Sequence, residues 1–190
     1  EIEETEMCGI FLVLGKKAKQ FDEERFLKAA DSQTNRGPDH TFLYQESGFR
    51  LSYKILSFSR VNNRGISDRE FFSSDSKSII ALNGEIYNWK ALSKEYFGDE
   101  NRFRSDTEFL VNFLRVKGPK VVMECVRGMY AVISYDTEAK KFLYFRDISG
   151  EKFLYKYEDN NCIVISSTID AILQYVGDVS VDEGTLISYM

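Results

Sequence analysis

The chain has 190 residues, 43% of them apolar and 29% charged, a composition that suits one globular domain with a sizeable core rather than a disordered or fibrous protein. Its net charge of −5, without a basic stripe, argues against a nucleic-acid partner, and no apolar run approaches the roughly 18 residues that span a membrane. The 3 cysteines are scattered and form no C-x-x-C pair, and the glutamate-rich start is not a secretory signal, so we expect a cytoplasmic protein without a disulfide framework.

The first part of the chain reads as strands around one helix. Residues 9–14, GIFLVL, form an apolar run of strand length. Apolar residues recur at helical spacing over about 22–33, behind an acidic first turn, and the Gly37-Pro38 pair then enforces a loop. Further strands are predicted over 41–46, 49–58 and 78–82, with the turn-rich NNRGISD before the last.

Two helices with recognisable ends follow. A short helix is predicted over 88–97, capped by Asn88 and closed by Gly98. Ser105, with Glu108 three residues on, forms a capping-box pattern that starts a second helix. Gly118-Pro119 stops this helix.

The last part of the chain reads mainly as hairpins. A further short helix is predicted to end at Gly128, and a final helix covers about 169–176. Between them lie four strand candidates, MYAVISYD, KFLYFRD, FLYKY and CIVISS, the first two joined by the polar turn DTEAKK. Successive hairpins with grouped helices predict an α+β fold with antiparallel sheets.

Four polar clusters are candidates for chemistry, and each alone has a purely structural interpretation. Cys8 precedes an apolar strand, where a cysteine usually acts as a small buried hydrophobe. NRGPDH is readable as a tight turn, the Asn-Gly of LNGEIYN as another turn, and RSDTE as the capping box. A zinc site would need distant residues to converge with His40. None of these clusters requires a function by itself.

Together, however, the motifs follow the order and spacing of a known family. They are MCGI at 7–10, RGPD at 36–39, NGEIYN at 83–88, SDTE at 105–108, RGMYA at 127–131 and RDISGEKFLY at 146–155. Over about residues 7–175 the chain resembles the class II glutamine amidotransferase domain, an N-terminal-nucleophile (Ntn) hydrolase, and is most similar to the N-terminal domain of asparagine synthetases. The resemblance implies an α+β fold, a four-layer αββα sandwich with two antiparallel sheets.

The resemblance assigns Cys8 as the nucleophile that attacks the side-chain amide of L-glutamine. A thiol with an ordinary pKa of about 8.5 needs a base. His40 is the single histidine and does not lie where the family places a base. The family uses the free α-amino group of the cysteine itself, whose ordinary pKa of about 7.7–8.0 leaves a neutral fraction at neutral pH.

The other roles follow residue by residue from the matched motifs. Arg60 would clamp the α-carboxylate of glutamine, and Glu85 with Asp106 would bind its α-ammonium. The side-chain amide of Asn83 and the backbone N–H of Gly84 would form the oxyanion hole. No metal is expected in this site.

Two further residues are expected to line the glutamine pocket, and the sequence departs from the family pattern at three places. The backbone of Val61 and Asn63 would line the glutamine pocket, but VNNRG replaces a more apolar, serine-containing stretch after Arg60. Phe153 stands where the family usually has proline, and Thr168 where a glutamate is usual. The last two would alter a surface that meets a partner domain.

The resemblance also predicts the domain organisation and the partners. Residues 1–7 are an extension, a cleaved propeptide or a remnant of expression, 8–178 are the type 2 amidotransferase domain, and 179–190 begin a linker into a synthetase (ATP-pyrophosphatase) domain. That domain, or a separate subunit, is the expected partner besides L-glutamine, and a homodimer is left open. No cofactor is expected here, whereas ATP and Mg belong to the synthetase domain.

Two functions remain open because residues precede Cys8. If they are removed, the domain is a glutaminase that feeds ammonia to the ATP-dependent amidation of a carboxylate. If they stay, the α-nitrogen of Cys8 is an amide and cannot act as a base. The domain would then be a catalytically silent scaffold, as in β-lactam synthetases.

Overall fold

The computed structural model describes residues 7–15, 22–56 and 65–177. Within these residues the strands form two antiparallel sheets. The five-stranded sheet has the order β2-β3-β1-β8-β7, with β1 Gly9–Gly15, β2 His40–Glu46, β3 Phe49–Ile55, β7 Tyr155–Glu158 and β8 Cys162–Ser166. The three-stranded sheet has the order β4-β5-β6, with β4 Ser78–Ile86, β5 Gly128–Asp136 and β6 Lys141–Arg146.

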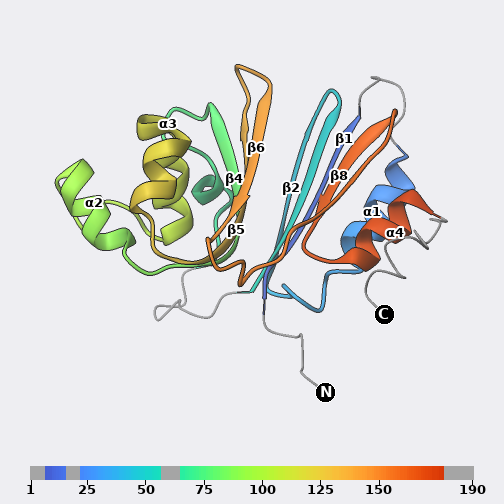
Figure 1. The fold of residues 1–190 in the computed structure, drawn as a ribbon, viewed down its shortest axis with the longest axis horizontal. Coiled ribbons are helices and arrows are strands. Elements are labelled where there is room, and N and C mark those ends of the chain that lie inside the picture. The colour runs from blue at the N-terminus through green and yellow to red at the C-terminus, as the bar shows by residue number, and fades with distance from the viewer. Residues whose placement is uncertain (1–6, 16–21, 57–64, 178–190) are drawn as a thin grey trace.

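Helices cover the outer face of each sheet (Figure 1). On the five-stranded sheet lie α1 Glu23–Asp31 and α4 Ile169–Val176, and on the three-stranded sheet lie α2 Trp89–Phe97 and α3 Asp106–Cys125. A 3-10 helix, η1, spans Asp68–Phe71. The four layers confirm the predicted αββα sandwich. Within the described residues, no helix has both the length and the apolar character to cross a membrane.

Strand alternation explains why both faces of each sheet are buried. In β1, Phe11 and Val13 pack under α1 and α4, whereas Ile10 and Leu12 face the other sheet. In β4, the odd-numbered Ile79 and Ala81 enter this inter-sheet core and their neighbours pack under α2 and α3. Successive side chains of a strand point to opposite faces, so each apolar run serves two layers.

Helix α3 follows the capping prediction at its start and bends where a stop was predicted. Ser105 accepts a hydrogen bond from the backbone N–H of Glu108 at 3.2 Å. At Gly118 the backbone is non-helical, with φ 77° and ψ 168°, so two helical segments meet at a kink. The second segment ends at Cys125 rather than at Gly128, which is the first residue of β5.

The cap predicted at Asn88 and the turn interpretation of Asn83–Gly84 were wrong. Asn88 precedes α2 but makes no capping bond; its side chain donates to Cys125 O and accepts from Arg127 N, both at 2.9 Å. The strand predicted over 78–82 continues to Ile86. The Asn-Gly pair in it is therefore not a turn, because ladder pairing with β5 overrides the local turn preference.

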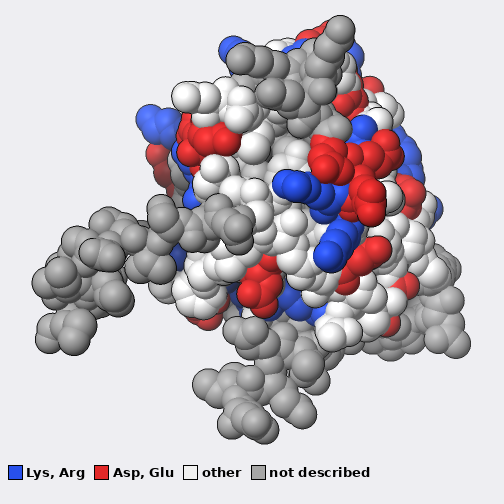
Figure 2. All heavy atoms as spheres, turned by 90° about the vertical axis from the view of Figure 1, so that its right-hand side faces the viewer, with Lys and Arg blue, Asp and Glu red and all other residues white. Residues whose placement is uncertain are grey.

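Acidic and basic side chains are intermixed on the side of the molecule covered by α1 and α4 (Figure 2). Asp22 and Arg25, for example, form an ion pair of 3.2 Å at the start of α1. Neighbouring opposite charges cancel at a distance. The face in this view therefore has no large patch of a single charge, in keeping with the absence of a basic stripe in the sequence.

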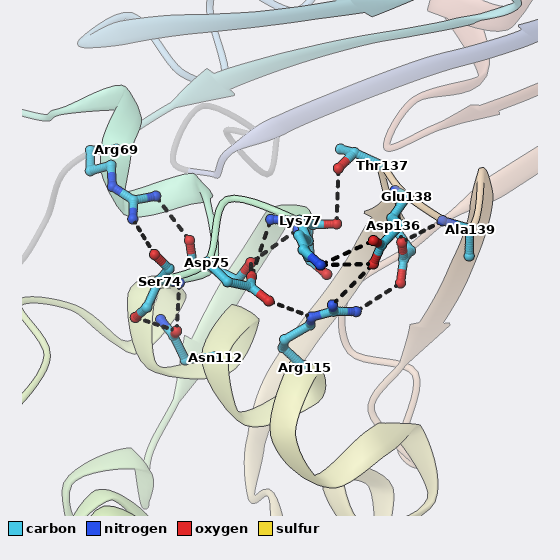
Figure 3. Close-up of polar contacts among 12 residues, drawn as sticks. Arg69, Ser74, Asp75, Lys77, Asn112, Arg115, Asp136, Thr137, Glu138 and Ala139 are labelled. Atoms are coloured by element: carbon cyan, nitrogen blue, oxygen red, sulfur yellow. Dashed lines mark hydrogen bonds and ion pairs between the residues drawn. The ribbon is translucent and has the colours of Figure 1, made fainter.

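A polar network ties α3 to the far end of the three-stranded sheet (Figure 3). Arg115 of α3 donates to Asp75 at 2.9 Å and to Asp136 at 3.0 Å, and lies 3.6 Å from Glu138. Lys77 pairs with Glu138 at 3.0 Å. The Ser73 hydroxyl and the Arg115 guanidinium lower the pKa of Asp75 to about 2. The network thus joins a turn, a helix and the β5–β6 hairpin.

We expect Arg115→Gln to lower the free energy of unfolding at neutral pH, measured by urea denaturation. The difference from the unchanged chain should shrink as the pH falls from about 4 toward 2, because Asp75 has a depressed folded-state pKa and its contribution is lost as it is protonated. Arg25→Gln, which removes a single exposed pair, is the control and should change little. Equal effects of the two variants would contradict a stabilising network.

Candidate active site

Cys8 lies directly before β1, at the end of the space between the two sheets. Gly9 pairs with Lys54 of β3, so in this antiparallel register Cys8 lies level with Ile55, the last residue of that strand. Its sulfur accepts from the backbone N–H of Leu56 at 3.5 Å and lies 3.8 Å from the Leu56 carbonyl oxygen. The hydroxyl of Tyr53 is 3.9 Å from the same sulfur. The thiol is thus held against the end of β3.

Burial raises the pKa of the Cys8 thiol above its ordinary value. The Leu56 N–H and the Tyr53 hydroxyl act in the opposite direction, since both favour the thiolate. Asp106 opposes the thiolate by its charge, and Arg36 favours it. Because burial dominates, the thiol is protonated at neutral pH, and a nucleophilic Cys8 requires a base.

Asn83 and Gly84 occupy β4, where they pair with Ala131 and Tyr130 of β5. Asn83 is 1% exposed, and its Oδ1 has no hydrogen-bond partner among the described residues. Gly84 has φ +126°, and a Cβ there would lie 1.9 Å from the Met129 carbonyl oxygen. Only glycine fits this position, both for its backbone angle and for the close approach of β5.

Asp106 is the first residue of α3, and it lies next to the end of β4. Its Oδ2 accepts from the backbone N–H of Ile86 at 3.0 Å, one residue beyond the exposed Glu85. Burial raises the pKa of Asp106, and the negative charge of Glu85 raises it further, against the hydrogen bonds from Ile86 and Thr107. The structure therefore brings the two predicted ammonium-binding carboxylates together.

The remaining predicted pocket residues, Arg60, Val61 and Asn63, lie outside the described residues, as does most of VNNRG. His40 is described, and its Nε2 lies 2.6 Å from Asp68 Oδ1. The single imidazole of the chain is thus paired with a carboxylate of η1.

The structure describes the two other residues that depart from the family pattern, Phe153 and Thr168. Phe153 is 54% exposed, between β6 and β7. Thr168 caps α4 by accepting from Ala171 N at 3.4 Å, and it also accepts from the buried Gln33 at 3.0 Å. In the described part of the chain, no group of three or more His, Cys, Asp or Glu side chains is placed to hold a metal ion.

Comparison with known proteins places this arrangement in a family. The family model of the glutamine amidotransferase domain matches residues 7–190. The chain belongs to the glutamine amidotransferase domain family. Asparagine synthetase B [glutamine-hydrolyzing] of Escherichia coli (strain K12) is 30% identical over 171 residues, which are 88% of this chain and 30% of that protein. Asparagine synthetase [glutamine-hydrolyzing] 1 of Arabidopsis thaliana is 31% identical over 150 residues, 78% of this chain and 25% of that protein.

The fold agrees with this assignment. The solved glutamine phosphoribosylpyrophosphate amidotransferase from B. subtilis, complexed with ADP and GMP, matches with a TM-score of 0.64 over 90% of this chain and 44% of that chain. At 16% identity this likeness concerns the fold alone. The predicted class II glutamine amidotransferase domain, similar to the N-terminal domain of asparagine synthetases, is confirmed.

The amidotransferase domain also contains a buried carboxylate to which the sequence analysis assigned no role. The buried Asp147, in RDISGEKFLY, accepts from the backbone N–H groups of Tyr130 at 3.2 Å, Glu151 at 3.0 Å and Lys152 at 3.3 Å. Burial alone would raise its pKa, but these hydrogen bonds hold the pKa below the ordinary value. Since Tyr130 pairs with Gly84, Asp147 supports β5 behind the predicted oxyanion hole. The position of Asp147 within a family motif marked it as a candidate residue. Its role in holding β5 became visible only once the structure showed that it is buried and hydrogen-bonded.

We expect Gly84→Ala to destabilise the amidotransferase domain more than Gly98→Ala. Both glycines have positive φ, so alanine costs about 1–2 kcal/mol of backbone strain at each. A Cβ at Gly98 meets nothing within 4 Å, whereas at Gly84 the clash with Met129 adds about 1–3 kcal/mol. Urea denaturation of the two variants measures the difference. If both variants lose the same free energy of unfolding, the close approach of β5 to Gly84 does not add to the cost of a side chain there.

Proposed function

We propose that this domain hydrolyses L-glutamine to glutamate and ammonia, with Cys8 as the nucleophile. One observation carries the proposal. The Tyr53 hydroxyl that lies 3.9 Å from the Cys8 sulfur also donates at 2.5 Å to the carbonyl oxygen of Leu82, the residue before Asn83. The thiol and the two predicted oxyanion-hole donors therefore lie at the same end of the inter-sheet space.

The base in this proposal is the α-amino group of Cys8, freed by removal of the residues before it. A thiol whose pKa is raised by burial needs such a group nearby. The side-chain hydrogen bond of His40 in the described part of the chain goes to Asp68 and not to Cys8, which supports the α-amino group as the base.

The proposed chemistry balances with one water. The amine takes the thiol proton, and the sulfur attacks the side-chain carbonyl carbon of glutamine. Asn83 and Gly84 donate to the oxyanion, the C–N bond breaks, and the proton passes to the leaving nitrogen, which departs as ammonia. Water then attacks the thioester, glutamate leaves, and the sulfur regains its proton.

Recognition of glutamine is proposed to rest on charge. The paired carboxylates of Glu85 and Asp106 favour a bound cation, because the α-ammonium would relieve both the burial of Asp106 and the repulsion between the two. Arg60 would bind the α-carboxylate, and the backbone of Val61 and Asn63 would line the pocket. Two carboxylates and one guanidinium would thus select an amino acid over a simple amide.

The chain spans 30% of the length of the E. coli relative. What happens to the ammonia would be determined outside these residues, and we state it as a proposal. We infer that a synthetase domain or subunit consumes it in amidating an ATP-activated carboxylate. ATP and Mg would bind there and not in residues 8–178, and residues 179–190 would lead toward that domain. The competing function is the silent scaffold, in which Cys8 keeps an amide nitrogen.

The state of the α-nitrogen separates these two functions. A chain that begins at Cys8 should release glutamate from glutamine and take up one equivalent of a diazoketone glutamine analogue, detected by intact mass. The chain that retains residues 1–7 should bind glutamine but release at most about one hundredth as much, since a general base contributes roughly 10²–10⁴-fold. Cys8→Ala should abolish labelling. The glutaminase proposal fails if the chain beginning at Cys8 is folded yet neither hydrolyses glutamine nor is labelled.

Asp106→Asn should raise the KM for glutamine by about tenfold or more, because it removes a charged hydrogen-bond partner of the ammonium. In the unchanged domain, KM should rise as the pH falls, starting at a higher pH than for an ordinary carboxyl, because the pKa of Asp106 is raised and the protonated form cannot pair with a cation. The variant should lose this dependence. Asp170→Asn, in the first turn of α4, is the control, and an unchanged KM in Asp106→Asn would exclude the ammonium role.

A further inference from the structure

Tyr53 connects the two sheets next to the candidate nucleophile. It lies in β3, pairs with Ile10 and Phe42, and is 3% exposed within the inter-sheet core. Its hydroxyl donates to the Leu82 carbonyl oxygen of β4 at 2.5 Å and lies 3.9 Å from the Cys8 sulfur. One side chain of the five-stranded sheet thus contacts both the thiol and the other sheet.

We propose that Tyr53 is a positioning residue for Cys8: it sets the distance between the sulfur and the Asn83–Gly84 segment, and it donates a hydrogen bond to the thiolate. The thiolate part stands on geometry alone, whereas the catalytic consequence rests on the glutaminase function proposed above.

The position of Leu82 explains the spacing role. β4 is an edge strand of the three-stranded sheet among the described strands, and a buried carbonyl without a partner there would cost about 1–3 kcal/mol. Tyr53 satisfies this carbonyl and thereby fixes β4 one residue before Asn83. A misplacement of about 1 Å between a nucleophile and its oxyanion donors can lower a rate about 100-fold.

The hydroxyl has one proton and two acceptors. With a neutral thiol, the proton lies on the short bond to Leu82. When the sulfur becomes a thiolate, the hydroxyl turns its proton toward the negative charge, since hydrogen bonds to ionised acceptors are the stronger ones. Burial, together with the charges of Cys8 and Asp106, raises the pKa of Tyr53 well above its ordinary value. Tyr53 therefore stays protonated and acts as a donor, not as a base.

Other charged groups also face Cys8, and substitution of Tyr53 leaves them in place. Asp106 of α3, itself next to Glu85, disfavours the thiolate, and Arg36 of the loop before β2 favours it. Lys152, from the turn after β6, lies 3.0 Å from the sulfur of Met7. A change in Cys8 ionisation on loss of the Tyr53 hydroxyl alone is therefore attributable to that hydroxyl.

The first test is the pH dependence of Cys8 alkylation by iodoacetamide, followed by peptide mass spectrometry in the full chain. Tyr53→Phe should move the midpoint of the profile to higher pH, because the thiolate loses a donor. Tyr135→Phe is the matched control: it is 3% exposed, lies in the same core and stacks on Phe49 at 4.0 Å. It should leave the profile unchanged. This test does not depend on glutamine hydrolysis.

A difluorinated tyrosine at residue 53 covers the case in which Tyr53→Phe does not fold. It keeps both contacts but is a stronger hydrogen-bond donor, so the midpoint should move to lower pH. An unchanged profile in a folded Tyr53→Phe chain, or in the difluorinated chain, would overturn the thiolate role.

The second test is hydrolysis by the chain that begins at Cys8. Tyr53→Phe should lower kcat about tenfold or more with little change in KM, because the ammonium-binding carboxylates are untouched. An unchanged kcat would overturn the spacing role. If alkylation shifts as expected while no chain beginning at Cys8 hydrolyses glutamine, the function proposal fails and the Tyr53–Cys8 contact stands.

Discussion

The face-to-face packing of two antiparallel sheets is the interaction on which the rest of this structure depends. It buries one side of β1 and β3 against β4 and β5, with Phe49 and Tyr135 stacked across the interface at 4.0 Å. Because this packing is apolar and extensive, it determines where the strand ends lie. The start of β1 and the part of β4 around Leu82 approach each other for that reason, and the Tyr53 hydroxyl contacts both the Cys8 sulfur and the Leu82 carbonyl oxygen.

The polar groups at this meeting point are held in unfavourable electrostatic states. Burial opposes ionisation of both the Cys8 thiol and the Asp106 carboxyl, and Glu85 adds like charge beside Asp106. Stability must then come from elsewhere in the fold. The apolar core layers contribute to it, the hydrogen-bonded Asp147 stabilises β5 next to the site, and the Arg115 network stabilises the opposite end of the same sheet. Proteins commonly hold functional groups in unfavourable states and offset this cost with stability from the rest of the fold.

The sequence predicted the elements well because their signals are local. The apolar run GIFLVL, the Ser105 cap and the glycine before Pro119 all act within a few residues, and the structure has a strand, a capped helix start and a helix kink at these places. Asn83–Gly84 was misread as turn chemistry when each cluster was taken alone, since strand pairing with β5 is a long-range effect. Tyr53 carried no local signal at all. Its register predicts only that it faces the core, and its role depends on the distance to a second sheet.

The family motifs located the candidate site more fully than any local rule. They pointed to Cys8 directly before β1, Gly84 in β4 and Asp106 in α3, three parts of the chain that only the tertiary fold brings together. What motifs do not encode is the solvation of these groups. The raised pKa of Cys8 comes from burial, which depends on everything packed around the end of β3.

Binding and catalysis are separable in such a site. The carboxylates beside β4 would attract an ammonium whether the nitrogen of Cys8 is an amine or an amide, because neither Glu85 nor Asp106 bonds to it. The reaction, in contrast, needs a proton acceptor beside a thiol that burial keeps protonated. A single peptide bond before Cys8 would therefore distinguish a glutaminase from a glutamine-binding scaffold with the same fold and the same pocket. In the proposed function, the covalent state of the Cys8 nitrogen therefore decides between hydrolysis and binding alone.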